Sequence, residues 1–271
     1  MNDIINQIES IVELEAIEKA RSRKDFSAYN YNGIPVPRVT KIIDAMSNKD
    51  YLLKYACDLT WYGYLREKDL VTSIGTHVHE AVEDFLVTGK DPELDFGKMP
   101  KQAYIIERAF NNFKAWYYDL LSHGNTIEIL GTEIPVITPY YAGTLDILAK
   151  INGQVYILDI KTSKKISSEH LLQTAAYMYG VNTYGLEKFP GIHINGIGII
   201  RVDKESKGLY EDLFLNEYNM YQTNIINYYV QGFLSILNAY YNKINIEYQF
   251  NQYKKNYPGL NNVINNLIEG E

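Results

Sequence analysis

The sequence is short of cysteine, since Cys57 is the only one among its 271 residues. A single thiol excludes an intrachain disulfide framework, and any iron–sulfur cluster or zinc site built from several cysteines of this chain. Apolar runs long enough to span a bilayer are also lacking, and the first residues are acidic rather than signal-like. We therefore expect a cytoplasmic protein with no membrane partner.

Positive charge is the third shortage, because the formal net charge is −7. The chain has no global basic field of the kind that many nucleic-acid binders carry, so nucleic acid would need a local basic groove. Hydrophobic residues are not scarce, at 46% of the chain, which is enough for a core. The 25 tyrosines are numerous, and their ordinary role is half-buried packing.

The spacing of apolar residues predicts a helical first half and a mixed second half. Helices are expected over residues 1–20, 39–46, 49–70, 72–87 and 101–121, with a short hairpin over 29–37 and breaks at 73–75 and 89–100. Strands follow over 126–138, 142–150 and 154–161, a helix from Ser167 or Ser168 to Tyr184, strands over 192–202 and 208–215, and a helix over 217–241. The tail from residue 248 is either one short helix or a frayed end. No repeat or linker divides the chain, which favours one α/β domain.

Asn152 and Gly153 stand between two runs rich in Ile, Leu, Val and Tyr. Asn-Gly in this setting is the strongest short-range hairpin signal, because both central residues of a type I′ turn need positive φ. A two-residue turn here places Asp146 directly opposite Asp159, and Lys161 projects from the same face as Asp159. Like charges opposed across a ladder are destabilising unless a positive group lies between them. The hairpin therefore predicts a divalent metal ion with the lysine beside it.

Four motifs now follow one another along the chain. They are Gly75 with His79 on a helix, Gly143-Thr-Leu-Asp146, Asp159-Ile-Lys161, and Gln173 with Tyr177 on the next helix. These residues and spacings resemble the RecB-like branch of the PD-(D/E)XK nuclease superfamily. The stretch 36–40 also resembles the opening of phage-type exonucleases and of the mitochondrial genome maintenance exonuclease, with Arg38 where those have serine. The resemblance covers residues 34 to 215.

The resemblance implies a restriction-endonuclease-like fold, in which helices flank a central mixed sheet. We expect a single nuclease domain over residues 1–271. Its parts would be a helical N-terminal part over 1–70, a catalytic core over 71–215 and a C-terminal helical part over 216–271.

Hydrolysis of a phosphodiester needs a water made nucleophilic near neutral pH, which a hard divalent ion supplies. Mg²⁺ or Mn²⁺ prefers oxygen ligands, and Asp146 and Asp159 offer two on a rigid hairpin. By resemblance, the carbonyl of Ile160 and the imidazole of His79 complete the metal ligands, and a histidine ligand favours tolerance of Mn²⁺. Glu83, four residues after His79 on the same helical face, is a candidate to orient it.

Lys161 would lie against the metal-bound water and the phosphate, either lowering the pKa of the water or stabilising charge on phosphorus. Gln173 and Tyr177, by resemblance, orient the site or the DNA strand. Thr162 and Ser163 offer hydroxyls to phosphates. Weaker candidates for contact with the site or DNA are Glu133, Arg38 and Arg201.

These expectations describe a metal-dependent DNA exonuclease that acts on single-stranded ends in recombination, repair or replication, in a bacterial or phage-infected cytoplasm. Its cofactor would be Mg²⁺ or Mn²⁺ and its partner DNA. Two alternatives remain open from the sequence. One is a structure-specific or flap endonuclease of the same fold, and the other is a catalytically silent nucleic-acid-binding module.

Overall fold

The computed structural model describes residues 6, 29–46, 61–94, 100–206 and 209–256. The helix expected over residues 1–20, the start of the helix expected at 49–70 and the end of the tail lie outside the described residues. The elements in chain order are β1 (Tyr29–Tyr31), β2 (Ile34–Val36), α3 (Val39–Met46), α5 (Trp61–Thr88), α6 (Pro100–Ser122), β3 (Ile127–Ile137), β4 (Ala142–Ile151), β5 (Gln154–Lys161), α7 (Ser168–Tyr184), β6 (Gly196–Val202), β7 (Tyr210–Asn216) and α8 (Met220–Asn256).

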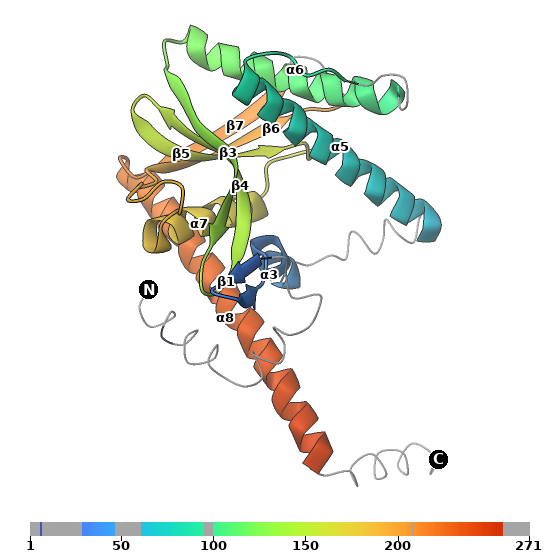
Figure 1. Ribbon diagram of the computed structural model, residues 1–271, viewed down its shortest axis with the longest axis vertical. Coiled ribbons are helices and arrows are strands. Elements are labelled where there is room, and N and C mark those ends of the chain that lie inside the picture. Colours follow the sequence, from blue (N-terminus) through green and yellow to red (C-terminus); the bar gives the residue numbers. More distant parts are fainter. Residues whose placement is uncertain (1–5, 7–28, 47–60, 95–99, 207–208, 257–271) are drawn as a thin grey trace.

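The main sheet has the strand order β3-β4-β5-β6-β7, and β1 and β2 form a separate hairpin (Figure 1). Strands β3, β4 and β5 form an antiparallel meander. Helix α7 then carries the chain to β6, which pairs parallel with β5, and β7 returns antiparallel to β6. The expected α/β class, with a mixed central sheet and flanking helices, is confirmed.

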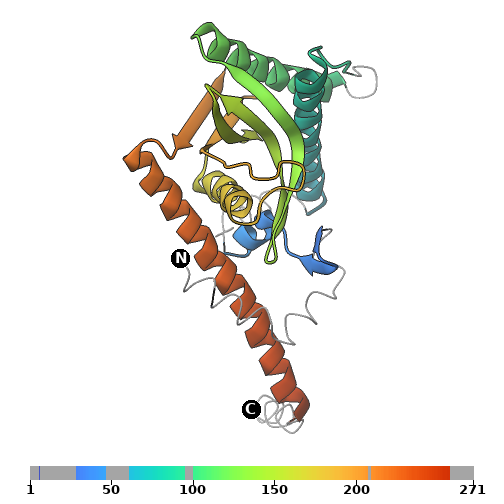
Figure 2. The same ribbon diagram turned by 60° about the vertical axis from the view of Figure 1, so that its left-hand side comes forward.

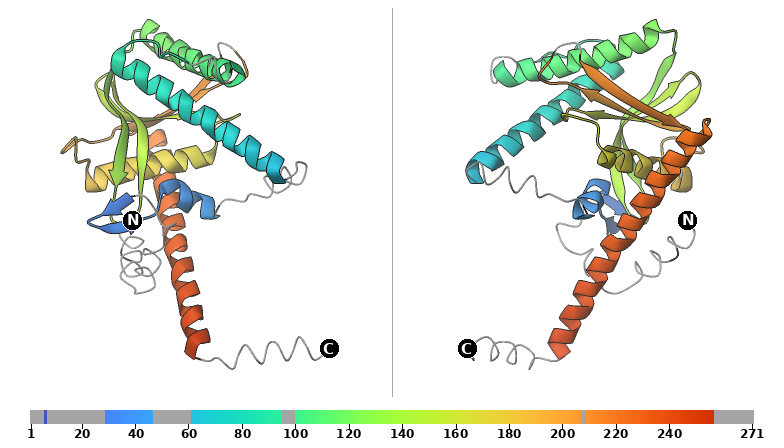
Figure 3. Two further views of the ribbon diagram at one scale, coloured as in Figure 1. Left: turned by 45° about the vertical axis from the view of Figure 1, so that its right-hand side comes forward. Right: turned by 180° about the vertical axis from the view of Figure 1, so that it is seen from behind.

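Helices cover both faces of this sheet. Figure 3 shows α5 and α6 on one side and α7 with α8 on the other. Each side buries its own core, because residues that alternate along a strand point to opposite faces. Ile157 of β5 packs among residues of α3, α7 and α8, whereas Leu158 packs among residues of α5 and α6. The sheet is therefore buried on both faces, and its strand ends are fixed in place between the helices.

The hairpin register expected from Asn152 and Gly153 is confirmed. Both residues have positive φ, 49° and 82°, and β4 pairs with β5 from Ile151 opposite Gln154 to Ile147 opposite Leu158. The regular pairing stops at Ile147 and Leu158, one residue short of Asp146 and Asp159. The two aspartates thus lie where the strands begin to separate, and their side chains have room to take part in a site.

Helix α5 runs without interruption through Ser73 and Gly75, so the break predicted there is wrong. The polar side chains of this stretch bond within the helix, for example Thr72 Oγ1 to the carbonyl of Lys68 and Thr76 Oγ1 to the carbonyl of Thr72. One glycine in a helix interior costs only about 0.5–1 kcal/mol relative to alanine, which flanking turns easily offset. The break predicted at Gly89 is confirmed, since Gly89 ends α5 with φ of 69°.

Two other predicted boundaries also differ. Strand β6 starts at Gly196 rather than at residue 192, because the Asn182 side chain bonds the backbone of Ile194 and the Asn195 side chain accepts from Val155. Helix α8 starts at Met220, where Asn219 Oδ1 accepts hydrogen bonds from the next backbone amides as an N-cap. It continues to Asn256, well past the predicted end, and its last turns project from the body (Figure 2).

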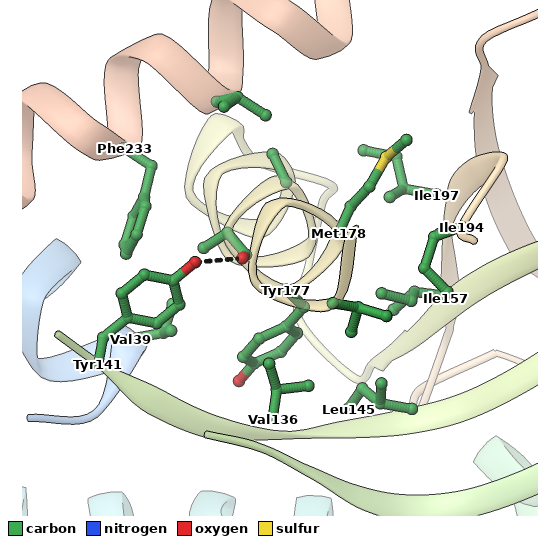
Figure 4. Packing of buried hydrophobic residues seen from close by; sticks show 14 of the residues in the cluster. Val39, Val136, Tyr141, Leu145, Ile157, Tyr177, Met178, Ile194, Ile197 and Phe233 are labelled. Carbon is green, nitrogen blue, oxygen red and sulfur yellow. Dashed lines mark hydrogen bonds between the residues drawn. The ribbon is translucent and has the colours of Figure 1, made fainter. Parts of the chain in front are cut away.

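Tyr141 joins the N-terminal end of β4 to α7 and α8. Its buried ring packs edge-to-face on Phe233 of α8, and its hydroxyl donates to the carbonyl of Ala176 in α7 at 2.8 Å (Figure 4). Tyr177, the next residue of α7, points from the helix toward the sheet, close to Val136 (Figure 4). The helix that carries Gln173 and Tyr177 is therefore fixed against β4.

Within the described residues, no helix is both long and apolar enough to cross a membrane.

Candidate metal centre

Asp146 bridges the gap where β4 and β5 separate. Its Oδ2 accepts a hydrogen bond of 2.7 Å from the backbone amide of Ile160, so a side chain replaces the next rung of the ladder. The side chain of Asp146 is only 11% exposed. The backbone amide of Ile160 thus holds this carboxylate in place beside the carboxyl end of β5.

His79 of α5 faces the same point from the opposite layer. Its Nε2 lies 3.1 Å from the carbonyl oxygen of Ile160, an interaction in which the ring N–H must donate. That bond turns Nδ1 toward the carboxylates, 3.6 Å from Asp146 Oδ2 and 3.9 Å from Glu133 Oε1. The Ile160 carbonyl therefore fixes the orientation of the ring, and Nδ1 is the nitrogen presented to the cluster. A role for that carbonyl as a metal ligand rests on the resemblance alone.

Glu133, a weaker candidate from the sequence, completes the cluster. It lies in β3 between Thr132 and Ile134, which pair with β4 on either side of Asp146. Ligand atoms of His79, Glu133 and Asp146 all lie within 4.8 Å of one another. Glu133 has φ of 46°, a conformation that costs a non-glycine residue of the order of 1–3 kcal/mol and that concentrates at functional sites. The backbone is strained where it directs this carboxylate to the cluster.

Asp159 and Lys161 form a buried ion pair next to this cluster. Lys161 Nζ lies 2.9 Å from Asp159 Oδ1 and 2.8 Å from Oδ2, and the Asp159 side chain is 2% exposed. Although Oδ2 is close to the ammonium group, it has no hydrogen-bond partner with suitable geometry. The carboxylate of Asp159 is therefore buried with capacity for one more positive partner.

Gln173 and Tyr177 extend the pair into a chain of contacts along α7. Lys161 Nζ donates to Gln173 Oε1 at 3.3 Å, and Gln173 Nε2 donates to the hydroxyl of Tyr177 at 3.3 Å. One amide thus serves both neighbours, which fixes its orientation. The four-residue spacing seen in the sequence places both side chains on the helix face that meets the site.

Gly143 is glycine because the ring of Tyr177 lies against it. A Cβ at this position would lie 2.5 Å from the Tyr177 hydroxyl and 2.6 Å from Cε1. The neighbouring Thr144 holds the hydroxyl of Tyr29, from the β1–β2 hairpin, at 2.6 Å between oxygens. Gly75 differs, since an added Cβ there would meet only Thr162 Oγ1 at 3.7 Å, an ordinary contact.

Burial and mutual repulsion of the carboxylates shift the titration of this group. Burial, and then the charge of Asp159, raise the pKa of Asp146 from 3.8 to about 6. Burial lowers the pKa of His79, but the neighbouring carboxylates of Glu133 and Asp146 outweigh it, so that the pKa is raised overall. Burial likewise opposes the charge of Lys161, yet the two aspartates leave its pKa above the ordinary value. The site thus concentrates negative charge that a cation would neutralise.

The donor set fits a hard divalent ion. It combines an imidazole nitrogen with carboxylate oxygens. Mn²⁺ accepts both kinds of ligand, and Mg²⁺ prefers the oxygens. His79, Glu133, Asp146 and Ile160 are among the residues that line a small cavity of about 10 Å³ between the layers. A cavity of that size is close to the volume of a single water-sized sphere. The pKa of Asp146 is raised, and Oδ2 of Asp159 has no hydrogen-bond partner. A bound cation would stabilise the ionised form of both carboxylates.

The other predicted residues are placed around the cluster. Glu83 accepts a hydrogen bond from Thr132 Oγ1 at 3.0 Å, so it contacts β3, and the carboxylates beside His79 are those of Asp146 at 3.6 Å and Glu133 at 3.9 Å. Thr162 is half-buried beside Gly75, whereas Ser163 is exposed and its hydroxyl donates to the carbonyl of Lys165.

The two weaker basic candidates have different surroundings. Arg38 is exposed and stacks over the ring of Tyr29 at 5.5 Å. Arg201, at the end of β6, is buried and bonds Asp203 at 3.0 Å.

Glu133 was only a weaker candidate from the sequence, because its position in the cluster depends on an irregularity in β3 between Ile129 and Gly131 and on its positive φ. No protein-family model matches the chain, and no curated protein sequence matches it significantly.

Proposed function

We propose that this protein is a metal-dependent deoxyribonuclease with a PD-(D/E)XK core. The observation that carries the proposal is the junction of β4 and β5, where Asp146, Asp159 and Lys161 meet and His79 approaches from α5. The antiparallel meander β3-β4-β5, followed by α7 and the parallel strand β6, is the arrangement expected of such a core. The two aspartates lie where the pairing of β4 with β5 ends, and both side chains are almost fully buried.

His79, Glu133, Asp146 and Asp159 would hold the Mg²⁺ or Mn²⁺ ion. When bound, a divalent ion supplies a water that ionises near neutral pH and offsets charge on the phosphate. The protein contributes the fixed positions, since Asp146 is tied to the Ile160 amide and His79 to the Ile160 carbonyl. Preorganised groups of this kind spare the site from reorganising during reaction.

Lys161 acts as a cation in this proposal rather than as a base. Its raised pKa keeps the ammonium group protonated at neutral pH, and a protonated amine cannot accept a proton from water. The same group can donate hydrogen bonds to a phosphate oxygen and stabilise the charge that develops there. Gln173 holds the ammonium group from the side of α7, and Tyr177 holds Gln173. Both are positioning residues for Lys161.

The substrate we propose is a single-stranded DNA end, hydrolysed by an exonuclease. The net charge of −7 favours a narrow, locally basic path over a broad duplex-binding face. A flap endonuclease would use the same chemistry and differ only in how the strand enters. A binding module without activity is the third possibility, although a module without chemistry gains nothing from two buried carboxylates beside a strained Glu133.

The test is a time course with Mg²⁺ or Mn²⁺ on labelled linear single strands, on a closed single-stranded circle and on a flap substrate. We expect the linear strand to be degraded and the circle to survive. Cleavage of the circle or release of an intact flap would replace the exonuclease by an endonuclease.

Asp159→Asn and Lys161→Ala should each lower the rate about 100-fold or more, as expected when a preorganised charge is removed from such a site. The control is Glu80→Gln, which changes an exposed carboxylate on the same helix as His79. Degradation that is equally fast in the wild type and in both site variants would refute the proposed centre.

A further inference from the structure

A second cleft, of about 640 Å³, opens beyond the outer edge of β3. The β1–β2 hairpin forms one wall, the edge of β3 forms the floor, and the loop from α7 to β6 forms the other wall. Its volume lies in the range of clefts that bind small molecules or single nucleotides, roughly 300–1,000 Å³. None of the residues placed in the metal centre lines it.

Tyr31 and Tyr184 both line this cleft, one from each wall. The ring of Tyr184 is held edge-to-face by Tyr140 at 6.3 Å and by Tyr179 at 6.5 Å between centroids, and the residue is still 36% exposed. A ring fixed in this way presents a surface on which a flat group can stack, at little cost in conformational entropy. The cleft therefore offers aromatic surface from both sides.

Asn30 and Asn32 add amide groups to the hairpin wall, and Lys188 and Glu187 add opposite charges to the loop wall. Among the parts of the chain that the structure describes, these four side chains make no hydrogen bond or ion pair. Amides and carboxylates bond the polar edges of nucleobases, and a lysine suits a phosphate. Planar aromatic surface, free amides and one cation together fit a nucleotide better than an aliphatic or purely anionic ligand.

The cleft is also close to the metal centre through two strands. In β1, Tyr29 bonds Thr144 beside Gly143, and Tyr31 lies two residues farther along, a distance of about 7 Å. In β3, Ile134 lines the cleft and directly follows Glu133 of the metal cluster. Arg38 stacks over Tyr29 and is exposed, so a cation lies beside the connection through β1.

We propose that this cleft binds one nucleotide of a single-stranded DNA substrate, a short distance along the strand from the phosphate at the metal centre. The base stacks on Tyr31 and Tyr184, the asparagines bond its edge, and Lys188 neutralises its phosphate. Arg38 lies beside the backbone between the two sites. This inference rests on the proposed function for its substrate, and it adds the place where the strand is held.

The experiment uses single-stranded oligonucleotides that carry 2-aminopurine at one position each, moved stepwise from either end. They are titrated, with Mn²⁺ present, into the full chain carrying Lys161→Ala to prevent turnover. Stacking on tyrosine quenches the probe, so one position near one end should be quenched most. Tyr184→Leu or Tyr31→Leu should abolish that quenching and weaken binding about 5- to 100-fold, the range for losing one base–aromatic stack.

The matched control is Tyr228→Leu, which removes a tyrosine that is 76% exposed on α8 and should change neither quantity. Lys188→Ala tests the cleft without altering a ring, and should weaken binding and reduce its dependence on salt. If the wild type degrades DNA but all three cleft variants show the same quenching pattern as the Lys161→Ala protein without them, the cleft inference fails and the nuclease stands. If quenching and its loss appear as expected but the wild type degrades nothing, the nuclease fails and the cleft stands. If no position is quenched, the cleft inference is wrong.

Discussion

Replacing Gly143 by alanine should disturb the site through one contact. The added methyl group would lie 2.5 Å from the hydroxyl oxygen of Tyr177 and 2.6 Å from Cε1, whereas carbon–carbon contacts are comfortable at roughly 3.5–4.0 Å. The ring must therefore move by about 1 Å within a close-packed core. The hydrogen bond from Gln173 to Tyr177 is already 3.3 Å long, so that movement breaks it or pulls Gln173 away from Lys161.

We expect Gly143→Ala to lower the free energy of unfolding by about 1–3 kcal/mol, the usual cost of overpacking a core. Gly75→Ala is the matched control, because it makes the same chemical change at the other motif glycine. The methyl group there meets only Thr162 at 3.7 Å and replaces glycine inside a helix, so it should stabilise the protein by about 0.5–1 kcal/mol. Urea denaturation of the metal-free proteins measures both changes.

The two variants should thus differ in sign, and a second change identifies the cause. Tyr177→Leu removes the ring atoms that the new methyl group would meet, so adding Gly143→Ala in that background should cost markedly less than in the wild type. A coupling energy of about 1–2 kcal/mol is expected for residues in direct contact. Equal effects of Gly143→Ala in both backgrounds, or a Gly143→Ala protein as stable as the wild type, would refute the close contact as the reason for this glycine.

Three other predictions concern the metal cluster and its hairpin. Glu133→Gln should weaken Mn²⁺ binding, measured by calorimetry, about tenfold or more. Glu83→Gln, which changes a carboxylate that bonds β3, should weaken it less. Equal losses of affinity in the two variants would count against Glu133 as a ligand. In the metal-free protein, folding raises the pKa of Asp146 from 3.8 to about 6, so the folded state binds the extra proton. The stability that this proton contributes is complete below pH 3.8 and is lost as the pH rises through about 6. Asp146→Asn should therefore flatten this part of a profile of melting temperature against pH. An unchanged profile would contradict the raised pKa of Asp146. Gly153→Ala should cost about 1 kcal/mol in urea denaturation because φ is 82°, although no atom obstructs the methyl group; no loss would mean that the turn adapts.

The elements that sequence analysis located well are those fixed by local chemistry. The β4–β5 register follows from Asn152 and Gly153 because only a few residue pairs accept positive φ twice. The same register then places Asp146 near Asp159 without any knowledge of the rest of the fold. Helix α7 was located equally well, since its first residue, Ser168, and its end at Tyr184 follow from an apolar pattern between turn residues.

The features that the sequence indicated only weakly, or not at all, depend on contacts between distant segments. Glu133 reaches the cluster only because β3 is irregular before it and strained at it, and neither property is visible in the residue types. Strand β6 begins late because Asn182 and Asn195 take backbone partners that a strand pattern would assign to the ladder. The cleft beside Tyr31 and Tyr184 joins residues more than 150 positions apart, so no local pattern predicts it.

The hydrogen bond from the Ile160 amide to Asp146 bears on how inactive forms of this protein should be prepared. Alanine at position 146 would remove a negative charge and also leave a buried N–H without an acceptor, a separate penalty of about 1–3 kcal/mol. Asparagine keeps an oxygen for that amide and removes only the charge. A lost activity in Asp146→Ala would therefore mix misfolding with chemistry, whereas Asp146→Asn isolates the chemistry and is the better choice for trapping a bound strand.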